Sequence, residues 1–211
     1  TTGVTLENGE RIPADLVVAN ADLPYVYSSL LPDKKPAASM DRLKYTSSTL
    51  MFYWGLKGPA ATDLLHHNVF LSDHLYRGSF QDIFYNHTLP QEPSFYIHAP
   101  VRTVPEFAPA GHDALMVLVP TGHLDSNQTQ DFVALQERAR RWVFDRLARI
   151  GLTDIEERIV QEHTFTPLDY QRIWNLAKGA AFGLSHNVMQ VGYLRPQNRH
   201  SQYRNLYFVG A

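Results

Sequence analysis

Two short apolar segments, one near each end of the chain, constrain the fold most strongly. Residues 206–209 are rich in strand-forming side chains and run directly into a glycine. Residues 16–19 form a similar continuous apolar run. Uninterrupted apolar runs of this length are typical of parallel strands that are buried on both faces, and a glycine turn after such a strand often faces a bound phosphate. We therefore expect the two runs to pair in one parallel sheet.

The residues that follow these runs are the expected cofactor contacts. They are Asn20 and Ala21 after the first run, and Gly210 and Ala211 after the second. Nucleotide-binding α/β domains hold phosphates at the N-terminus of the next helix, and no residue follows Ala211 to form one. The chain is therefore expected to be part of a longer protein. The alternative is that these four residues only end strands.

Between the two runs the pattern changes to that of a different sheet. Residues 48–56 alternate, with Phe52 and Trp54 on one face. Residues 132–150 repeat apolar side chains at helical spacing. This predicts an α+β fold: a mostly antiparallel or mixed sheet with helices and two largely covered faces, flanked by two strands of a discontinuous Rossmann-like domain. Further strands are expected at 69–72, 94–99, 114–119 and 158–164.

Local turn and cap signals place three further elements. Asn8 and Gly9 are the preferred pair for a tight two-residue hairpin turn. Asp22 is expected to cap a helix that continues to about residue 31. Thr166 followed by Pro167 predicts the start of another helix, with the hydroxyl as its cap and proline in its first turn.

Composition excludes several classes of function. The chain of 211 residues has no cysteine, which removes disulfide scaffolds and cysteine nucleophiles, and its net charge of −2 gives no support for a nucleic-acid partner. None of its ten histidines lies in a recognised ligand spacing, so no metal is expected. No Gly-x-Ser-x-Gly, Walker A or Gly-x-Gly-x-x-Gly motif is present.

The order of several segments resembles the C-terminal half of bacterial- and fungal-type phytoene desaturases. The resemblance covers nearly the whole chain, which makes it more specific than any single motif. The segments that carry it are ADLVVANAD at 14–22, FYWGL at 52–56, TPLD at 166–169, NLAKGAAFGLSHN at 175–187 and NLYFVGA at 205–211.

What the resemblance implies is an FAD-dependent oxidoreductase that introduces double bonds into a lipophilic C40 polyene. FAD accepts a hydride equivalent from an allylic C–H while a base removes the neighbouring proton, and the protein supplies an apolar tunnel. The resemblance assigns 1–35 and 199–211 to an FAD-binding domain and 40–198 to a substrate domain. The proposed acid/base residues of the family fall outside this chain, so its catalytic residues are unknown.

The resemblance also suggests where a polyene would lie. The small-residue segment 179–186 is the expected wall between substrate and flavin, because small side chains let a ring and a polyene stack closely. The alternative is tight helix–sheet packing. The substrate contacts expected are Phe52, Trp54, Gly179, Phe182, Gly183, Leu184 and His186.

Other functions stay open. A related flavin amine oxidase, a carotenoid isomerase or a carotenoid ketolase would share much of the pattern, and a non-catalytic lipid-binding module is the alternative outside enzymes. We expect the chain alone to bind FAD poorly and to be inactive, and the longer protein to be cytoplasmic with peripheral membrane contact. The oligomeric state is not indicated.

Overall fold

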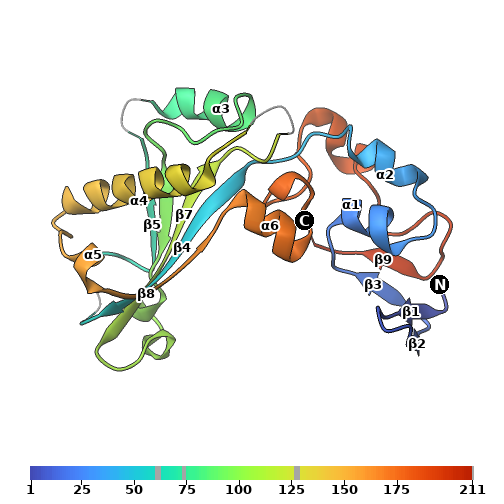
Figure 1. The fold of residues 1–211 in the computed structure, drawn as a ribbon, viewed down its shortest axis with the longest axis horizontal. Helices are drawn as coiled ribbons and strands as arrows, with labels where there is room; N and C mark the ends of the chain where they lie inside the picture. The colour runs from blue at the N-terminus through green and yellow to red at the C-terminus, as the bar shows by residue number, and fades with distance from the viewer. Residues whose placement is uncertain (60–62, 73–74, 126–128, 211) are drawn as a thin grey trace.

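The computed structural model describes residues 1–59, 63–72, 75–125 and 129–210, and it confirms the α+β class. A five-stranded sheet lies at one end of the molecule, and the two-stranded sheet of β3 (Val17–Ala19) and β9 (Leu206–Phe208) lies toward the other (Figure 1). Helix α6 (Pro167–Trp174) lies between these two parts (Figure 1).

The five-stranded sheet has the order β5-β6-β7-β4-β8, and every neighbouring pair is antiparallel. Its longest pairing joins β4 to β7 over ten residues, from Ser48↔Thr121 to Lys57↔His112. The expected antiparallel sheet is confirmed. The strands are β4 (Ser48–Lys57), β5 (His67–Phe70), β6 (Phe95–His98), β7 (His112–Thr121) and β8 (Ile159–Phe165).

Helix α4 (Phe132–Ala148) covers one face of this sheet and confirms the helix expected at 132–150 (Figure 1). The Asp131 carboxylate caps it by accepting hydrogen bonds from the N–H groups of Val133 and Ala134, both at 3.1 Å. Its buried stripe packs into the main core with alternate residues of β4 and β7. Helices α3 (Tyr76–Phe84) and α5 (Ile155–Arg158) complete this part of the chain.

The opposite face of the sheet is only partly covered, which corrects the expectation of two covered faces. Exposure rises along β4 from 1% at Thr49 through 7% at Met51 to 41% at Tyr53. The Tyr170 hydroxyl of α6 hydrogen-bonds the Thr49 hydroxyl at 2.8 Å, so α6 covers one end of this face. The other end borders a cavity of about 690 Å³. We call this side the open face.

The two end strands pair as predicted. β3 (Val17–Ala19) and β9 (Leu206–Phe208) are parallel, with Val17 opposite Leu206 and Ala19 opposite Phe208. The expected burial on both faces is wrong within the described residues, because Val18 is 51% exposed. One side only is covered, by a cluster that includes Val26. The covering elements are α1 (Leu23–Tyr25) and a π-helix η1 (Val26–Leu30), and α2 (Lys35–Met40) packs against these two.

The local signals had mixed outcomes. β1 (Gly3–Thr5) and β2 (Arg11–Pro13) form the expected hairpin, but its loop is wider than two residues because the Leu6 N–H bonds the Glu10 carbonyl at 2.9 Å. The Asp22 side chain makes no cap hydrogen bond to α1. Thr166 does cap α6, in a reciprocal capping box with Asp169.

Short 3-10 turns connect the remaining segments. They are η2 (Pro100–Arg102), η3 (Pro105–Phe107), η4 (Ala177–Gly179), η5 (Val188–Gln190) and η6 (Gly192–Leu194). Among the helices that the structure describes, none has both the length and the apolar character that crossing a membrane requires.

Candidate functional site

The expected cofactor turns lie side by side at the carboxyl edge of the β3–β9 sheet. Parallel pairing brings the two strand ends together, and the Val209 N–H extends the ladder by bonding the Ala19 carbonyl at 3.1 Å. Asn20 and Gly210 follow directly. In open parallel sheets, ligands bind outside this edge. Ala211, the fourth expected contact, lies outside the described residues.

Gly210 is in close contact with Asn20. Its φ of +100° is a conformation that other residues rarely adopt, and a Cβ at this position would lie 2.6 Å from the Asn20 Oδ1. The side of Gly210 next to Asn20 therefore has no room for a side chain. The turn places backbone, rather than side chain, at this point of the sheet edge.

A cleft of about 80 Å³ opens next to this edge. Ala21, Leu184 and Gly210 line it, so the structure brings together one expected residue from each of three distant segments. Asp22 also lines it, and its carboxylate accepts a hydrogen bond from the Ala177 N–H at 2.7 Å. Burial raises the pKa of Asp22, although this backbone bond opposes the shift. Asp22 thus joins the end of β3 to the 177–184 segment instead of capping α1.

The remaining residues expected in the wall segment are dispersed. Gly179 is buried, a Cβ there would overlap the Pro167 carbonyl, and its own carbonyl accepts the Ser48 hydroxyl at 2.5 Å. This is the tight packing that the alternative interpretation anticipates at this residue. Gly183 is also buried, whereas Phe182 and His186 are exposed.

Phe52 and Trp54 lie in the main core, 0% and 1% exposed. Trp54 stacks on Phe144 of α4 with ring centroids 4.9 Å apart, and its indole N–H donates to the Glu162 carboxylate at 2.8 Å. Both side chains therefore face α4 rather than the open face, although Trp54 is among the residues that border the open-face cavity. The aromatic side chain of β4 that does face that side is Tyr53.

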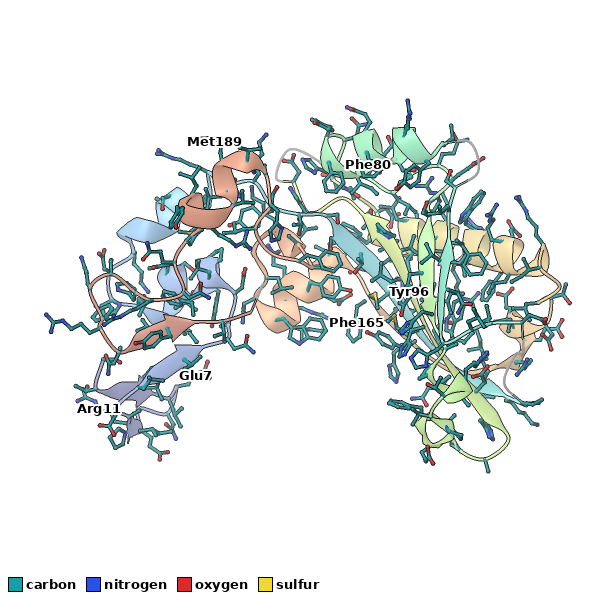
Figure 2. The ribbon with its side chains drawn as sticks, turned by 180° about the vertical axis from the view of Figure 1, so that it is seen from behind. Glu7, Arg11, Phe80, Tyr96, Phe165 and Met189 are labelled. Carbon is teal, nitrogen blue, oxygen red and sulfur yellow. The ribbon has the colours of Figure 1, made fainter. Side chains whose placement is uncertain are left out.

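Aromatic rings follow one another along the open face. Tyr53 packs edge-on against Phe165 with ring centroids 5.9 Å apart, and Phe165 contacts Tyr170 and Trp174 of α6. Phe165 lies where β8 approaches α6 (Figure 2). The 690 Å³ cavity begins at Tyr53 and continues past Met116. Apolar surface therefore extends from α6 along much of this face.

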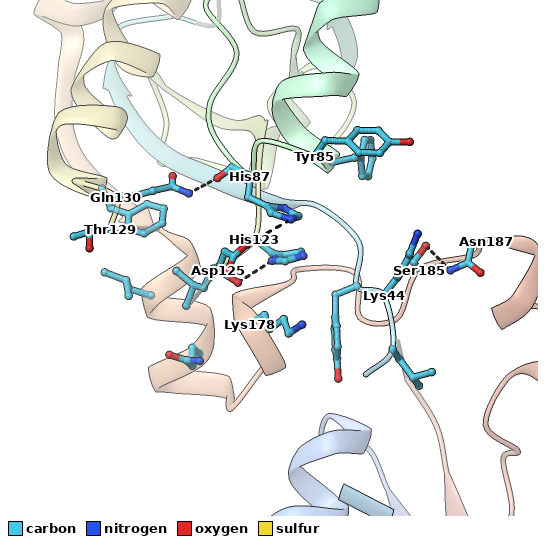
Figure 3. A pocket seen from close by; sticks show the side chains of 17 residues that line it. Lys44, Tyr85, His87, His123, Asp125, Thr129, Gln130, Lys178, Ser185 and Asn187 are labelled. Carbon is cyan, nitrogen blue, oxygen red and sulfur yellow. Dashed lines mark hydrogen bonds and ion pairs between the residues drawn. The ribbon is translucent and has the colours of Figure 1, made fainter. Parts of the chain in front are cut away.

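A second, larger cavity of about 1170 Å³ was not anticipated from the sequence (Figure 3). Two histidines stack in it: His87, three residues after α3, and His123, two residues after β7, have ring centroids 4.1 Å apart. The His87 Nε2 lies 3.9 Å from the Asp125 carboxylate. Lys178, next to the expected wall segment, also points into this space (Figure 3).

His123 is held in a form that can accept a proton. Its Nδ1 lies 2.8 Å from the Leu124 carbonyl, which can only accept, so the proton is on Nδ1 and Nε2 carries a lone pair. Burial lowers the pKa of His123, the bond to Leu124 opposes this, and His87 and Lys178 lower it further. A neutral ring with a free Nε2 is the form a general base requires.

Unsatisfied polar atoms mark the same cavity. Among the described residues, His87 Nδ1 and Gln130 Oε1 are buried without a hydrogen-bond partner, and both residues line the cavity. His87 also has a φ of +49°, and a Cβ at Gly122 would overlap the His87 backbone. Buried unpaired polar groups and strained backbone are typical of functional sites. The two histidines are 36 residues apart, so no local spacing could have predicted that they stack.

Curated proteins of similar sequence match this chain over its whole length. A phytoene desaturase of Phycomyces blakesleeanus is 43% identical over 216 residues, which cover 100% of this chain and 37% of the relative. The zeta-carotene-forming phytoene desaturase of Myxococcus xanthus is 44% identical over 213 residues, covering 100% of this chain and 40% of the relative. The chain is homologous to phytoene desaturases. The recognised resemblance is confirmed.

The similarity covers only part of each phytoene desaturase, and a protein with another named activity is also similar to this chain. The chain spans about two fifths of the length of the curated relatives it matches. A 4,4'-diapolycopene oxygenase of Methylomonas sp is 37% identical over 215 residues, covering 99% of this chain and 41% of the relative. No protein-family model matches the chain.

Two solved structures are similar at lower identity. A reduced UDP-galactopyranose mutase is 14% identical with a TM-score of 0.45, covering 78% of this chain and 32% of that one. An oxidoreductase from Methanosarcina mazei is 16% identical with a TM-score of 0.49, covering 99% of this chain and 42% of that one.

Proposed function

We propose that this chain is part of an FAD-dependent carotenoid desaturase that converts phytoene to a coloured carotene. The observation that carries the proposal is the identity of 43–44% to phytoene desaturases along the whole chain. An aromatic open face and a histidine-containing cavity support it, because such an enzyme needs an apolar path for a long polyene and a group that accepts a proton.

The carboxyl edge of the β3–β9 sheet is our candidate for part of the FAD site. Asn20, Ala21 and Gly210 would hold it, together with Ala211, which is expected from the sequence alone. The close approach of Gly210 to Asn20 fits a turn that presents backbone to a ligand. The cleft of about 80 Å³ fits one portion of a dinucleotide, so these residues would form one part of a larger site. When bound, FAD supplies the hydride acceptor for the reaction.

The open face of the five-stranded sheet is our candidate for the polyene path. Tyr53, Phe165 and Tyr170 present rings along it, and the cavity beyond them is mainly apolar. A rigid polyene gains affinity by burying apolar surface against such rings, at about 25 cal/mol per Å². Phe52 and Trp54, which were expected to contact substrate, would support this surface from behind.

His123 is our candidate for the proton acceptor. Formation of each double bond removes a hydride from one carbon and a proton from its neighbour, and the His123 Nε2 lone pair would take that proton. The Asp125 carboxylate beside His87 and the Nδ1–H bond to Leu124 would stabilise the resulting positive charge. His186, the histidine expected from the resemblance, is exposed and lies outside the residues lining this cavity.

The proposed activity is tested with the intact protein and phytoene in liposomes, followed by pigment separation. We expect coloured desaturation products, and a flavin absorbance spectrum in the purified protein. His123→Asn should lower the rate at least 100-fold at unchanged flavin content, whereas His186→Asn, the matched control, should stay within twofold. A flavin-free protein that binds phytoene without converting it would instead indicate a lipid-binding module.

A carotenoid oxygenase is the second candidate, because the 4,4'-diapolycopene oxygenase is 37% identical over the same residues. Parallel incubation with 4,4'-diapolycopene distinguishes the two activities. Oxygenated products from that substrate, with phytoene unchanged, would replace the desaturase proposal. We further propose peripheral membrane contact, since the substrate is lipophilic; co-sedimentation with liposomes measures it.

A further inference from the structure

Three histidines converge at the edge of the five-stranded sheet where β5 and β6 pair. His67 and His98 are direct cross-strand partners. His66 immediately precedes β5, and its carbonyl accepts the Ala99 N–H at 2.8 Å. Each histidine offers a ring nitrogen, and these three nitrogens lie within 4.8 Å of one another. The strand pairing therefore fixes the positions from which all three side chains start.

The hydrogen bonds of His66 indicate that its proton is on Nδ1 and that Nε2 is unprotonated. Its Nδ1 lies 2.5 Å from the Thr103 hydroxyl, and that hydroxyl donates to the Pro100 carbonyl at 3.5 Å. A hydroxyl has one hydrogen, so Thr103 accepts from the His66 Nδ1–H. The His66 Nε2 then carries a lone pair and accepts a hydrogen bond from the His98 Nε2–H at 2.8 Å. When both nitrogens bind a metal, this proton moves to the His98 Nδ1. Two ring nitrogens thus face each other at the centre of the cluster.

His67 supplies the third nitrogen. Its Nδ1 is hydrogen-bonded to the Tyr96 hydroxyl at 2.6 Å, and its ring stacks on that of His98 with centroids 5.5 Å apart. Histidines that bind metal commonly use one ring nitrogen for the ion and hold the other in an outer hydrogen bond. Both His66 and His67 have such an outer partner in a hydroxyl group.

The charge state of the cluster also favours a cation ligand set. Burial lowers the pKa of His98, and His66 and His67 lower it further. Neutral imidazole is the form that coordinates metal. No carboxylate belongs to the cluster among the described residues, which favours an imidazole-preferring ion over Ca²⁺ or Mg²⁺.

We propose that His66, His67 and His98 bind one Zn²⁺ ion through three ring nitrogens, leaving a fourth coordination position open. With Zn–N distances of about 2.0–2.1 Å, tetrahedral geometry places ligand nitrogens about 3.3 Å apart. The cluster has one pair at 2.8 Å and all three nitrogens within 4.8 Å, so small side-chain rotations complete the site. The ion would join the segment before β5 to the end of β6. His98 also lines the open-face cavity, so the site lies at that cavity's margin.

The test is a calorimetric titration of the purified, tag-free protein with Zn²⁺, with Co²⁺ as a spectroscopic probe of geometry. We expect one equivalent of Zn²⁺ to bind, and Co²⁺ to give the intense visible bands of a four-coordinate complex. His66→Ala and His98→Ala should each weaken Zn²⁺ binding at least 100-fold. Thr103→Val, which removes only the outer hydrogen bond, should weaken it about 10-fold.

The matched control is His163→Ala, which removes another histidine of the same cavity that is outside the cluster. It should leave Zn²⁺ affinity unchanged. Circular dichroism establishes whether each variant is folded. If the variant at half-buried His66 or His98 does not fold, His67→Ala, at an exposed position, replaces it. Absence of saturable Zn²⁺ binding would overturn the proposal, as would equal affinity in wild type and the cluster variants. Either result would leave the three histidines as a hydrogen-bonded group only.

Discussion

The two faces of the five-stranded sheet differ in how deeply their side chains are buried. On the α4 side, alternate residues of β4 and β7 are almost fully buried, and Leu50, Phe52 and Val117 are each 0% exposed. On the open face, the intervening residues become more exposed with distance from α6, reaching 41% at Tyr53. The same strands therefore carry a stability-determining surface and a surface free to bind a ligand.

This difference separates two kinds of aromatic residue that look alike in the sequence. Phe52, Tyr53 and Trp54 are consecutive, yet the first and third are core residues and the second faces the open side. Strand geometry sends neighbouring side chains to opposite faces. The comparison predicts that substitutions on the core face act mainly on stability, and those on the open face mainly on substrate handling.

The largest expected effect is that of Trp54→Ala. Removing a fully buried indole that stacks on Phe144 should lower the free energy of unfolding by about 3–5 kcal/mol. Urea denaturation followed by circular dichroism measures it. Tyr53→Ala is the matched control on the other face and should cost under about 1.5 kcal/mol. Equal losses for the two variants would break the proposed distinction between the faces.

The next largest effect is expected at the ion pair between Arg102 and Asp113. Asp113 lies near the start of β7 and is 1% exposed, and its carboxylate is in direct contact with the Arg102 guanidinium. Asp113→Ala removes the buried carboxylate that pairs with the Arg102 guanidinium. Such a change typically lowers the free energy of unfolding by about 3 kcal/mol or more. Chemical denaturation of Asp113→Ala and of the double variant Arg102→Ala/Asp113→Ala measures it. A single variant as stable as wild type would contradict the prediction.

Much of the fold followed from sequence patterns because those patterns act locally. The alternation over residues 48–56 predicted β4, the helical repeat over 132–150 predicted α4, and Thr166 with Pro167 predicted the capped start of α6. The pairing of β3 with β9 also followed, since two apolar runs of parallel-strand type were available. Each of these depends on residues whose spacing is fixed by secondary structure.

The sites depend on contacts between distant residues and were mostly not predictable. His87 and His123 stack because Gly122 lets two loops approach, and His66 reaches His98 through strand pairing. Asp22 looked like a helix cap but bonds Ala177 instead, a contact across 155 residues. Gly210 near Asn20 is the exception, because parallel pairing of the two predicted strands places their ends together.

A smaller, pH-dependent effect is expected from His123, which lies just beyond β7. Burial, His87 and Lys178 lower its pKa in the folded protein, while Leu124 and Asp125 oppose the shift. Its contribution to stability is therefore present above the unfolded pKa of about 6.5 and is lost as the pH falls through the lower folded pKa. Denaturation between pH 7.5 and 5 should show stability falling in wild type, and falling less in His123→Asn. Identical pH profiles would exclude His123 as a cause.

The smallest effect expected is that of Tyr170→Phe, where α6 covers the end of the open face. The variant removes the hydroxyl that bonds Thr49 at 2.8 Å and keeps the ring that contacts Phe165. Burial raises the pKa of Tyr170 to about 12, so the group is a neutral hydroxyl at physiological pH. Losing one neutral hydrogen bond at Thr49, a residue that is 1% exposed, should cost about 1 kcal/mol. Thr49→Val alone should cost a similar amount, and the double variant little more, because each change removes the same bond. Strictly additive losses, measured by urea denaturation, would show that the two hydroxyls act independently and that their bond does not hold α6 on this face.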